Sequence, residues 1–170
     1  RKRLLESEAP QCASREHPDA TVTWTLEEIY HGTYKTVRFE RRARVPREVC
    51  KLRVHVRPGQ PVSSDPVKAT SEVSSGVFVR FRVAAHSRFE RIAGRAADLA
   101  MRVQLKASEI VNNRYNVRFT HLNGCDYDIP LAVKPSLMPC ERVLKSMGMP
   151  VYQSDRNQYG NLIVFLSLIE

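Results

Sequence analysis

The chain has 170 residues, of which 26% are charged and 42% are hydrophobic. This balance is typical of a folded globular protein and excludes a disordered one. No apolar stretch approaches the roughly 20 residues that a membrane-spanning helix needs, so we expect no membrane partner. The net charge of +9 at pH 7 suits an acidic protein surface or a nucleic acid.

The cysteines and histidines do not have the spacing of a metal site. Four cysteines lie far apart and form no CxxC pair, and the five histidines are equally scattered. We therefore predict no metal and no cofactor. We expect free thiols and an intracellular reducing compartment, the cytoplasm first, with the mitochondrion and the axoneme as alternatives. The cysteines are Cys12, Cys50, Cys125 and Cys140. Because the chain begins with Arg1 and not Met, we expect a fragment or a processed product.

The first elements are short. Residues 1–20 are predicted to be an irregular, proline-interrupted linker. A strand is predicted at 21–24, where branched and polar residues alternate. A single helical turn follows, which Thr25 can cap while Glu28 occupies the capping-box position. Gly32 ends this turn.

Alternation of apolar and polar residues predicts the next strands. They cover residues 34–39, 51–57, 77–83 and 99–105. Lys35, Val37 and Phe39 share one face of the first of these strands, because successive side chains of a strand point to opposite faces.

A hairpin is predicted in the second half of the chain. Asn123-Gly124 favours a tight turn, since both residue types tolerate positive φ. The flanking strands are predicted at 115–120 and 127–131, and a closing strand at 161–169.

These elements predict an all-β protein, mainly β with two short helical turns. We expect two tandem β-sandwich domains, a first one at 21–105 and a second one at 106–170. Both share the order of helical turn, hairpin and closing strand, which suggests an internal duplication.

Two short patterns suggest chemistry but lack the context for it. His17-Pro18-Asp19 is the tripeptide that joins two helices in J-domains, whereas here a predicted strand follows it. Asp126 and Asp128 share one face of a strand, as an acid–base pair would, but a solvated hairpin edge is the favoured interpretation. We find no enzyme signature and predict that the protein is not an enzyme.

Several segments together resemble the C-terminal peptide-binding region of DnaJ-type J-domain co-chaperones. They are Leu26–Thr33, Lys35–Phe39, Val56–Gly59, His86–Arg91, Leu122–Gly124, Gly148–Pro150 and Gly160–Val164. They run in the family's order over nearly the whole chain. The family's zinc-binding cysteine repeats are absent, so the chain resembles the zinc-free class. The glycine-rich turn of the family is replaced by Arg41–Pro46.

The resemblance implies a fold and a function. It implies two β-domains in series, the first with an apolar groove at an exposed strand. An unfolded or extended polypeptide client would add there as an extra strand, for delivery to a DnaK-type ATPase. Carried over by position, Lys35 would lie at the rim, Val37 and Phe39 would receive apolar client groups, and Phe89 would form one wall. The alternative is that Val37 and Phe39 belong to the core.

A second function stays open. A diverged member would serve as a structural subunit, docking through its basic faces in a large ribonucleoprotein or cytoskeletal assembly. Nucleic acid is a weaker alternative partner, because the aromatic residues share a strand face with aliphatic residues and not with arginine.

Overall fold

The computed structural model describes residues 18–41, 48–69 and 77–169. Within them the chain is mainly β, with one short helix, α1 (Leu26–His31), and two 3-10 turns, η1 (Ala107–Glu109) and η2 (Pro135–Leu137). The predicted all-β class is therefore confirmed. No helix in this described part is long and apolar enough to cross a membrane.

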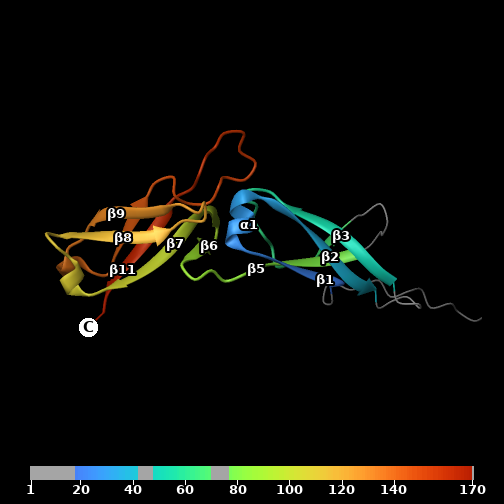
Figure 1. Ribbon diagram of the computed structural model, residues 1–170, viewed down its shortest axis with the longest axis horizontal. Helices are drawn as coiled ribbons and strands as arrows, with labels where there is room; N and C mark the ends of the chain where they lie inside the picture. Colours follow the sequence, from blue (N-terminus) through green and yellow to red (C-terminus); the bar gives the residue numbers. More distant parts are fainter. Residues whose placement is uncertain (1–17, 42–47, 70–76, 170) are drawn as a thin grey trace, which may run out of the picture. The chain divides into compact units, whose positions relative to one another are not determined.

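The strands follow in the order shown by the colours of Figure 1. They are β1 (Ala20–Trp24), β2 (Thr33–Arg41), β3 (Glu48–Val56), β4 (Val67–Ala69), β5 (Val77–Val83), β6 (Phe89–Ile92), β7 (Arg95–Leu105), β8 (Arg114–Thr120), β9 (Asp126–Ala132), β10 (Cys140–Leu144) and β11 (Leu162–Leu168).

The chain forms two compact units that are interleaved in sequence. Unit 1 consists of residues 1–23, 34–54 and 62–82, and unit 2 of residues 24–33, 55–61 and 83–170. The sequence analysis expected consecutive domains at 21–105 and 106–170, and this division stays a prediction. Strand β7 lies before that boundary but pairs in parallel with β11, which lies after it.

Unit 1 contains two sheets. One has the strand order β1-β5-β4, and the other consists of β2 and β3. Strand β5 contributes fully buried Val77 and Val79, whereas Val83, at the end of the same strand, is 38% exposed. Leu52 and Val54 of β3 are buried, as their alternation predicted.

Unit 2 is built on a four-stranded sheet with the order β10-β11-β7-β6. Strand β11 is the most apolar segment of the chain, and it lies between antiparallel β10 and parallel β7. The β8–β9 hairpin supplies buried Val117, Phe119 and Leu131 to the core.

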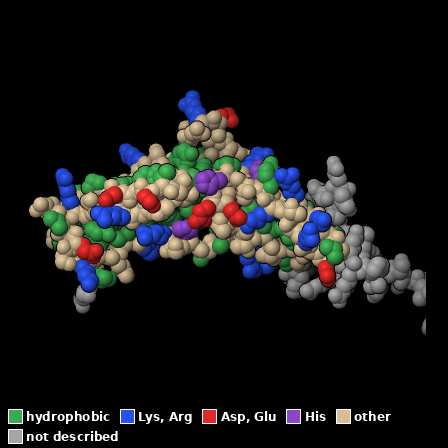
Figure 2. All heavy atoms as spheres, in the orientation of Figure 1, with side chains coloured by type: hydrophobic (Ala, Val, Ile, Leu, Met, Phe, Trp, Pro, Cys, Tyr) green, Lys and Arg blue, Asp and Glu red, His purple; other side chains and the backbone are tan. Residues whose placement is uncertain are grey.

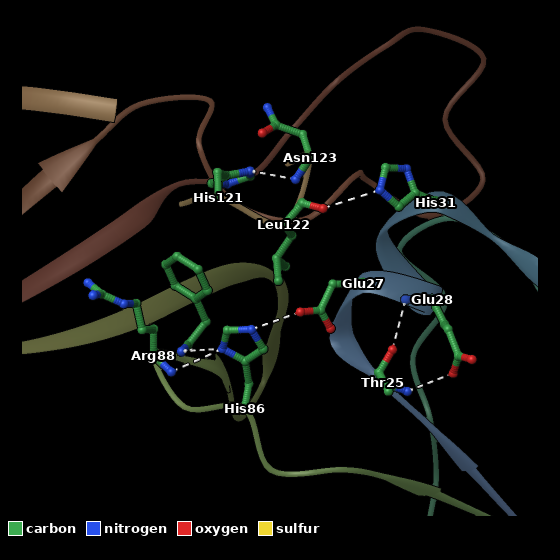
Figure 3. Close-up of polar contacts among 10 residues, drawn as sticks. Thr25, Glu27, Glu28, His31, His86, Arg88, His121, Leu122 and Asn123 are labelled. Carbon is green, nitrogen blue, oxygen red and sulfur yellow. Dashed lines mark hydrogen bonds and ion pairs between the residues drawn. The ribbon is translucent and has the colours of Figure 1, made fainter. Parts of the chain in front are cut away.

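Helix α1 begins where the sequence predicted. The Thr25 side chain accepts a hydrogen bond from the Glu28 N–H at 3.2 Å, and the Glu28 carboxylate accepts one from the Thr25 N–H at 2.9 Å (Figure 3). This capping box satisfies two of the backbone donors that a helix start leaves open. Gly32 ends the helix with φ of 73°.

The hairpin connection differs in detail from the prediction. Only Gly124 takes a positive φ, and the connection runs over residues 121–125. His121 donates its backbone N–H to Cys125 O, and the Asn123 side chain accepts from the Cys125 N–H. The Asn123 side chain thus satisfies a backbone donor within the loop. This bond stabilises a connection longer than two residues.

Candidate functional site

Strand β2 carries the row of residues that the resemblance singles out. Lys35, Val37 and Phe39 are all partly buried, whereas Thr36 and Arg38, which alternate with them, are exposed. The predicted sharing of one face is thus confirmed. Val37 and Phe39 are thus less buried than core residues and less exposed than surface residues.

Strand β3 packs its own inward row more completely. Leu52, Val54 and Val56 are buried, while Lys51 and Arg53 are exposed. The Arg53 guanidinium lies over the Tyr34 ring of β2, 4.4 Å from its centroid. The outer face of this two-stranded sheet is therefore basic, and its apolar residues point the other way.

Strand β2 hydrogen-bonds to β3 along one edge. Among the described strands, no other pairs with β2. A strand paired on one side only presents backbone N–H and C=O groups along its second edge, spaced for another strand. The partly buried row of Lys35, Val37 and Phe39 belongs to this strand.

Lys35 has a specific partner within unit 1. Its ammonium donates to the backbone oxygen of Thr23 in β1 at 2.6 Å. This bond connects β2 to a strand of the other sheet, so the ammonium helps to fix β2. The sequence placed Lys35 at the rim of a groove and gave no sign of this bond.

Phe89 does not present a surface to a client in this structure. It lies at the start of β6 in unit 2, and its side chain is 1% exposed. Its ring packs edge-on against Phe119 and at a tilt against the His121 ring, both at centroid distances of 5.9 Å. Phe89 is therefore a core residue of unit 2, whereas Lys35, Val37 and Phe39 belong to unit 1.

The two patterns that suggested other chemistry have structural partners. The Asp19 carboxylate accepts from the Phe78 N–H at 2.9 Å, which anchors the start of β1, while His17 lies outside the described residues. Asp126 accepts from the Thr120 hydroxyl, and Asp128 pairs with Arg118 at 3.1 Å. Both aspartates thus form cross-strand pairs at an exposed hairpin.

The described residues bring no three potential metal ligands together. Cys50, Cys125 and Cys140 are free thiols, and Cys12 lies outside the described part. The basic side chains are spread over the face drawn in Figure 2 and do not gather in one patch.

Comparison with protein families identifies the family of this chain. The family model of the DnaJ C terminal domain matches residues 19–169. The chain belongs to the DnaJ C-terminal domain family. A search of curated proteins finds no match to the chain.

Family membership gives the general role of a domain of this kind. DnaJ C-terminal domains are chaperone cofactor domains that are generally not enzymes, and they have client polypeptides and DnaK-type chaperones as partners in general. The β2 strand lies inside the matched region.

Proposed function

We propose that unit 1 binds extended segments of unfolded polypeptides by strand addition at the second edge of β2, and that the full protein delivers them to a DnaK-type ATPase. The observation that carries this proposal is the partly buried row of Val37 and Phe39 beside an edge that no described strand occupies.

Strand addition suits a promiscuous binder. Main-chain hydrogen bonds form with any extended peptide, whatever its side chains, and they supply a part of the affinity that does not depend on sequence. Val37 and Phe39 then select clients with exposed apolar residues, since burying one large apolar side chain contributes about 1.5–3 kcal/mol. Lys35 completes the row, and we assign Phe89 no direct contact with the client.

A charge placed in the row tests this assignment. We expect the Val37→Asp, Phe39→Asp double variant to lower affinity for a reduced and carboxymethylated protein by about tenfold or more, because it removes apolar contact and buries charge. Thr36→Asp is the matched control, since Thr36 is exposed on the opposite face of the same strand. Equal affinity of the double variant and the wild-type protein would count against the groove.

A modified peptide tests the backbone contribution separately. A seven-residue apolar peptide with an N-methyl group on every residue has no backbone N–H left to donate, so neither of its edges can form a complete hydrogen-bonded ladder with β2. We expect it to bind far more weakly than the unmethylated peptide of the same sequence, in fluorescence anisotropy with the wild-type protein. Equal binding of the two peptides would show that the backbone edge is not used.

A second function, docking in a large ribonucleoprotein or cytoskeletal assembly, is supported by the outer face of β2 and β3. Arg38, Lys51 and Arg53 are all exposed there. Binding of this kind should weaken steeply with salt, because contacted charges release counterions. Stoichiometric co-purification with an assembly, lost in an Arg38→Glu, Lys51→Glu variant, together with indifference to unfolded clients, would favour this function over the first.

For the setting of either function we propose a reducing intracellular compartment. The support is the presence of three free thiols, one of them exposed at Cys125. A localisation experiment on the tagged full-length gene product tests this proposal.

A further inference from the structure

Unit 2 contains a small cavity that is separate from β2 and has an aromatic lining. Its volume is about 250 Å³. The lining comes from α1, the β8–β9 hairpin, the segment after β10 and the segment before β11. The lining residues are Tyr30, His121, Asn123, Tyr127, Ser146, Met147 and Tyr159.

The aromatic rings of the lining form one continuous series. Tyr159 stacks on Tyr30 at 6.0 Å, and Tyr30 meets the His121 ring edge-on at 5.4 Å. His121 in turn meets Tyr127 edge-on at 6.0 Å. Rings packed in this way hold one another in place and present flat apolar surface with hydroxyl groups at its edge.

Helix α1, which carries Tyr30, is fixed by two histidines. His86 donates to the Glu27 carboxylate at 2.9 Å, and its second ring nitrogen accepts from the Arg88 N–H at 3.0 Å. His31 donates to the Leu122 carbonyl at 3.2 Å. These bonds hold the helix against both β6 and the hairpin loop, so Tyr30 is positioned before any ligand arrives.

The lining carries no formal charge. His121 is 5% exposed, and its Nε2 donates to the Met147 carbonyl at 2.8 Å. Its Nδ1 accepts from the Asn123 N–H at 3.3 Å, so the imidazole is neutral. The other lining groups are phenols, an amide, a hydroxyl and a thioether.

The hydrogen bonds within the lining leave hydroxyl protons free to donate to a ligand. The Tyr127 hydroxyl accepts from the Asn123 amide at 3.1 Å, which leaves its own proton to donate. Burial and Tyr159 both raise the pKa of Tyr30, so its phenol keeps its proton. The Met147 carbonyl is already used by His121, and the Asn123 side-chain oxygen by the Cys125 N–H at 2.8 Å.

This chemistry selects among ligands. A phosphate or carboxylate would find no cation in the lining, and a protonated amine would find no carboxylate. A proline-containing segment fits an uncharged lining with free hydroxyl protons, because a proline residue is uncharged and offers a carbonyl acceptor without an amide N–H. Its ring packs on flat aromatic surface, and its extended polyproline conformation is already ordered before binding.

We propose that this cavity binds a proline-containing extended segment of a partner polypeptide, with the proline ring against the tyrosine rings and the preceding carbonyl accepting from Tyr127 or Tyr159. The cavity is below the size of most small-molecule sites, which start at about 300 Å³, but it is large enough for a proline side chain. This site is independent of β2 and adds a second recognition element to the protein.

Two uncharged, terminally blocked peptides test the proposal on the 170-residue chain: one with three prolines among alanines, and one with alanine at every position. Chemical shift perturbation in NMR titrations should map the first peptide to the lining residues. We expect the proline peptide to bind at least about fivefold more tightly than the alanine peptide, because each hydrogen bond and ring contact contributes about 1 kcal/mol.

Three variants in the lining and one control variant locate the site. Tyr127→Phe and Tyr159→Phe remove one hydroxyl each and keep the ring, and each should weaken the proline peptide by about threefold to tenfold. Tyr34→Phe, in unit 1, is the matched control and should change nothing. A Tyr159→Ala variant removes a ring that is 39% exposed, so loss of binding there would not reflect loss of folding.

Three outcomes would overturn the proposal. The two peptides could bind equally well, or a trimethyllysine peptide could bind more tightly than the proline peptide, which would identify a cation cage. Loss of proline-peptide binding in the Val37→Asp, Phe39→Asp variant would place the peptide at β2. Unchanged binding in that variant supports the cavity and leaves the proposed function of β2 to its own test.

Discussion

The two units contain the same tripeptide at corresponding positions of a strand, with different outcomes. Val37-Arg38-Phe39 lies in β2 of unit 1, and Val117-Arg118-Phe119 lies in β8 of unit 2. Both arginines are exposed, so the alternation of faces is the same. Val117 is 2% and Phe119 4% exposed, whereas Val37 and Phe39 are only partly buried.

The difference comes from what packs on each strand. Phe119 has the Phe89 ring of β6 at 5.9 Å and stacks on Tyr127 of β9 at 5.6 Å. Strand β2 has β3 as its only described partner. An apolar strand face therefore becomes core where other elements cover it and a candidate binding surface where they do not, and the strand's own sequence does not distinguish the two.

The first test of this difference truncates Phe119 and Phe39, the two phenylalanines of the shared tripeptide. Phe119→Ala should lower the free energy of unfolding by about 3–5 kcal/mol, because it empties a filled core position. Phe39→Ala should cost about 1 kcal/mol, since the ring is only partly buried and less contact is lost. Urea denaturation followed by circular dichroism measures both.

Equal losses in these two variants would show that Phe39 is as well packed as Phe119. The groove proposal would then lose its main support. A small loss for Phe39→Ala together with weaker client binding would strengthen it.

The second prediction concerns the strand that covers Phe119. Arg91 of β6 donates to Gln60 O at 2.8 Å, to Gly59 O at 2.9 Å and to Ala96 O at 2.7 Å, and burial lowers its pKa. Arg91→Ala should lower the free energy of unfolding by about 2–4 kcal/mol, because it leaves these carbonyls without their donor.

The matched control for Arg91 is Arg95, at the start of the neighbouring strand β7. Arg95 is exposed and lies 3.9 Å from the Asp98 carboxylate, so Arg95→Ala should cost less than about 1 kcal/mol. If β6 is what makes Val117 and Phe119 core, amide hydrogen exchange in β8 should accelerate in Arg91→Ala and stay unchanged in Arg95→Ala. Unchanged exchange in both variants would show that the burial of Val117 and Phe119 in β8 does not depend on β6.

The sequence predicted elements better than it predicted their environment. Alternation located β5 at 77–83, and capping chemistry located α1, because both signals are local. Strand β6 was missed, since Phe89–Ile92 has four residues and no clear alternation, and its pairing with β7 is a tertiary contact.

The candidate site shows the same limit. The face shared by Lys35, Val37 and Phe39 follows from spacing alone, but the bond from Lys35 to Thr23 O and the burial of Phe89 depend on neighbours distant in sequence. The tyrosines of the unit 2 cavity, Tyr30, Tyr127 and Tyr159, come from three segments distant in the sequence, and no sequence pattern joins them.

The smallest expected effect contrasts two tyrosines, Tyr30 of unit 2 and Tyr34 of unit 1. Burial raises the pKa of Tyr30 from 10 to about 12, with a further contribution from Tyr159. The neutral phenol is thus favoured in the folded state, and its contribution to stability is fully present below about pH 10. As pH rises from about 10 to 12, the unfolded chain releases this proton before the folded chain does, so the contribution is lost.

The measurement is the free energy of unfolding of the wild-type protein, Tyr30→Phe and Tyr34→Phe between pH 8 and 12. The wild-type protein should lose stability with a steeper slope above about pH 10 than Tyr30→Phe, because only the former carries the raised pKa. Tyr34 is 56% exposed, and Tyr34→Phe should follow the wild-type slope. If Tyr30→Phe also follows that slope, Tyr30 is as accessible as a tyrosine on the outer face of β2, and the aromatic series that lines the cavity of unit 2 is not closed in solution.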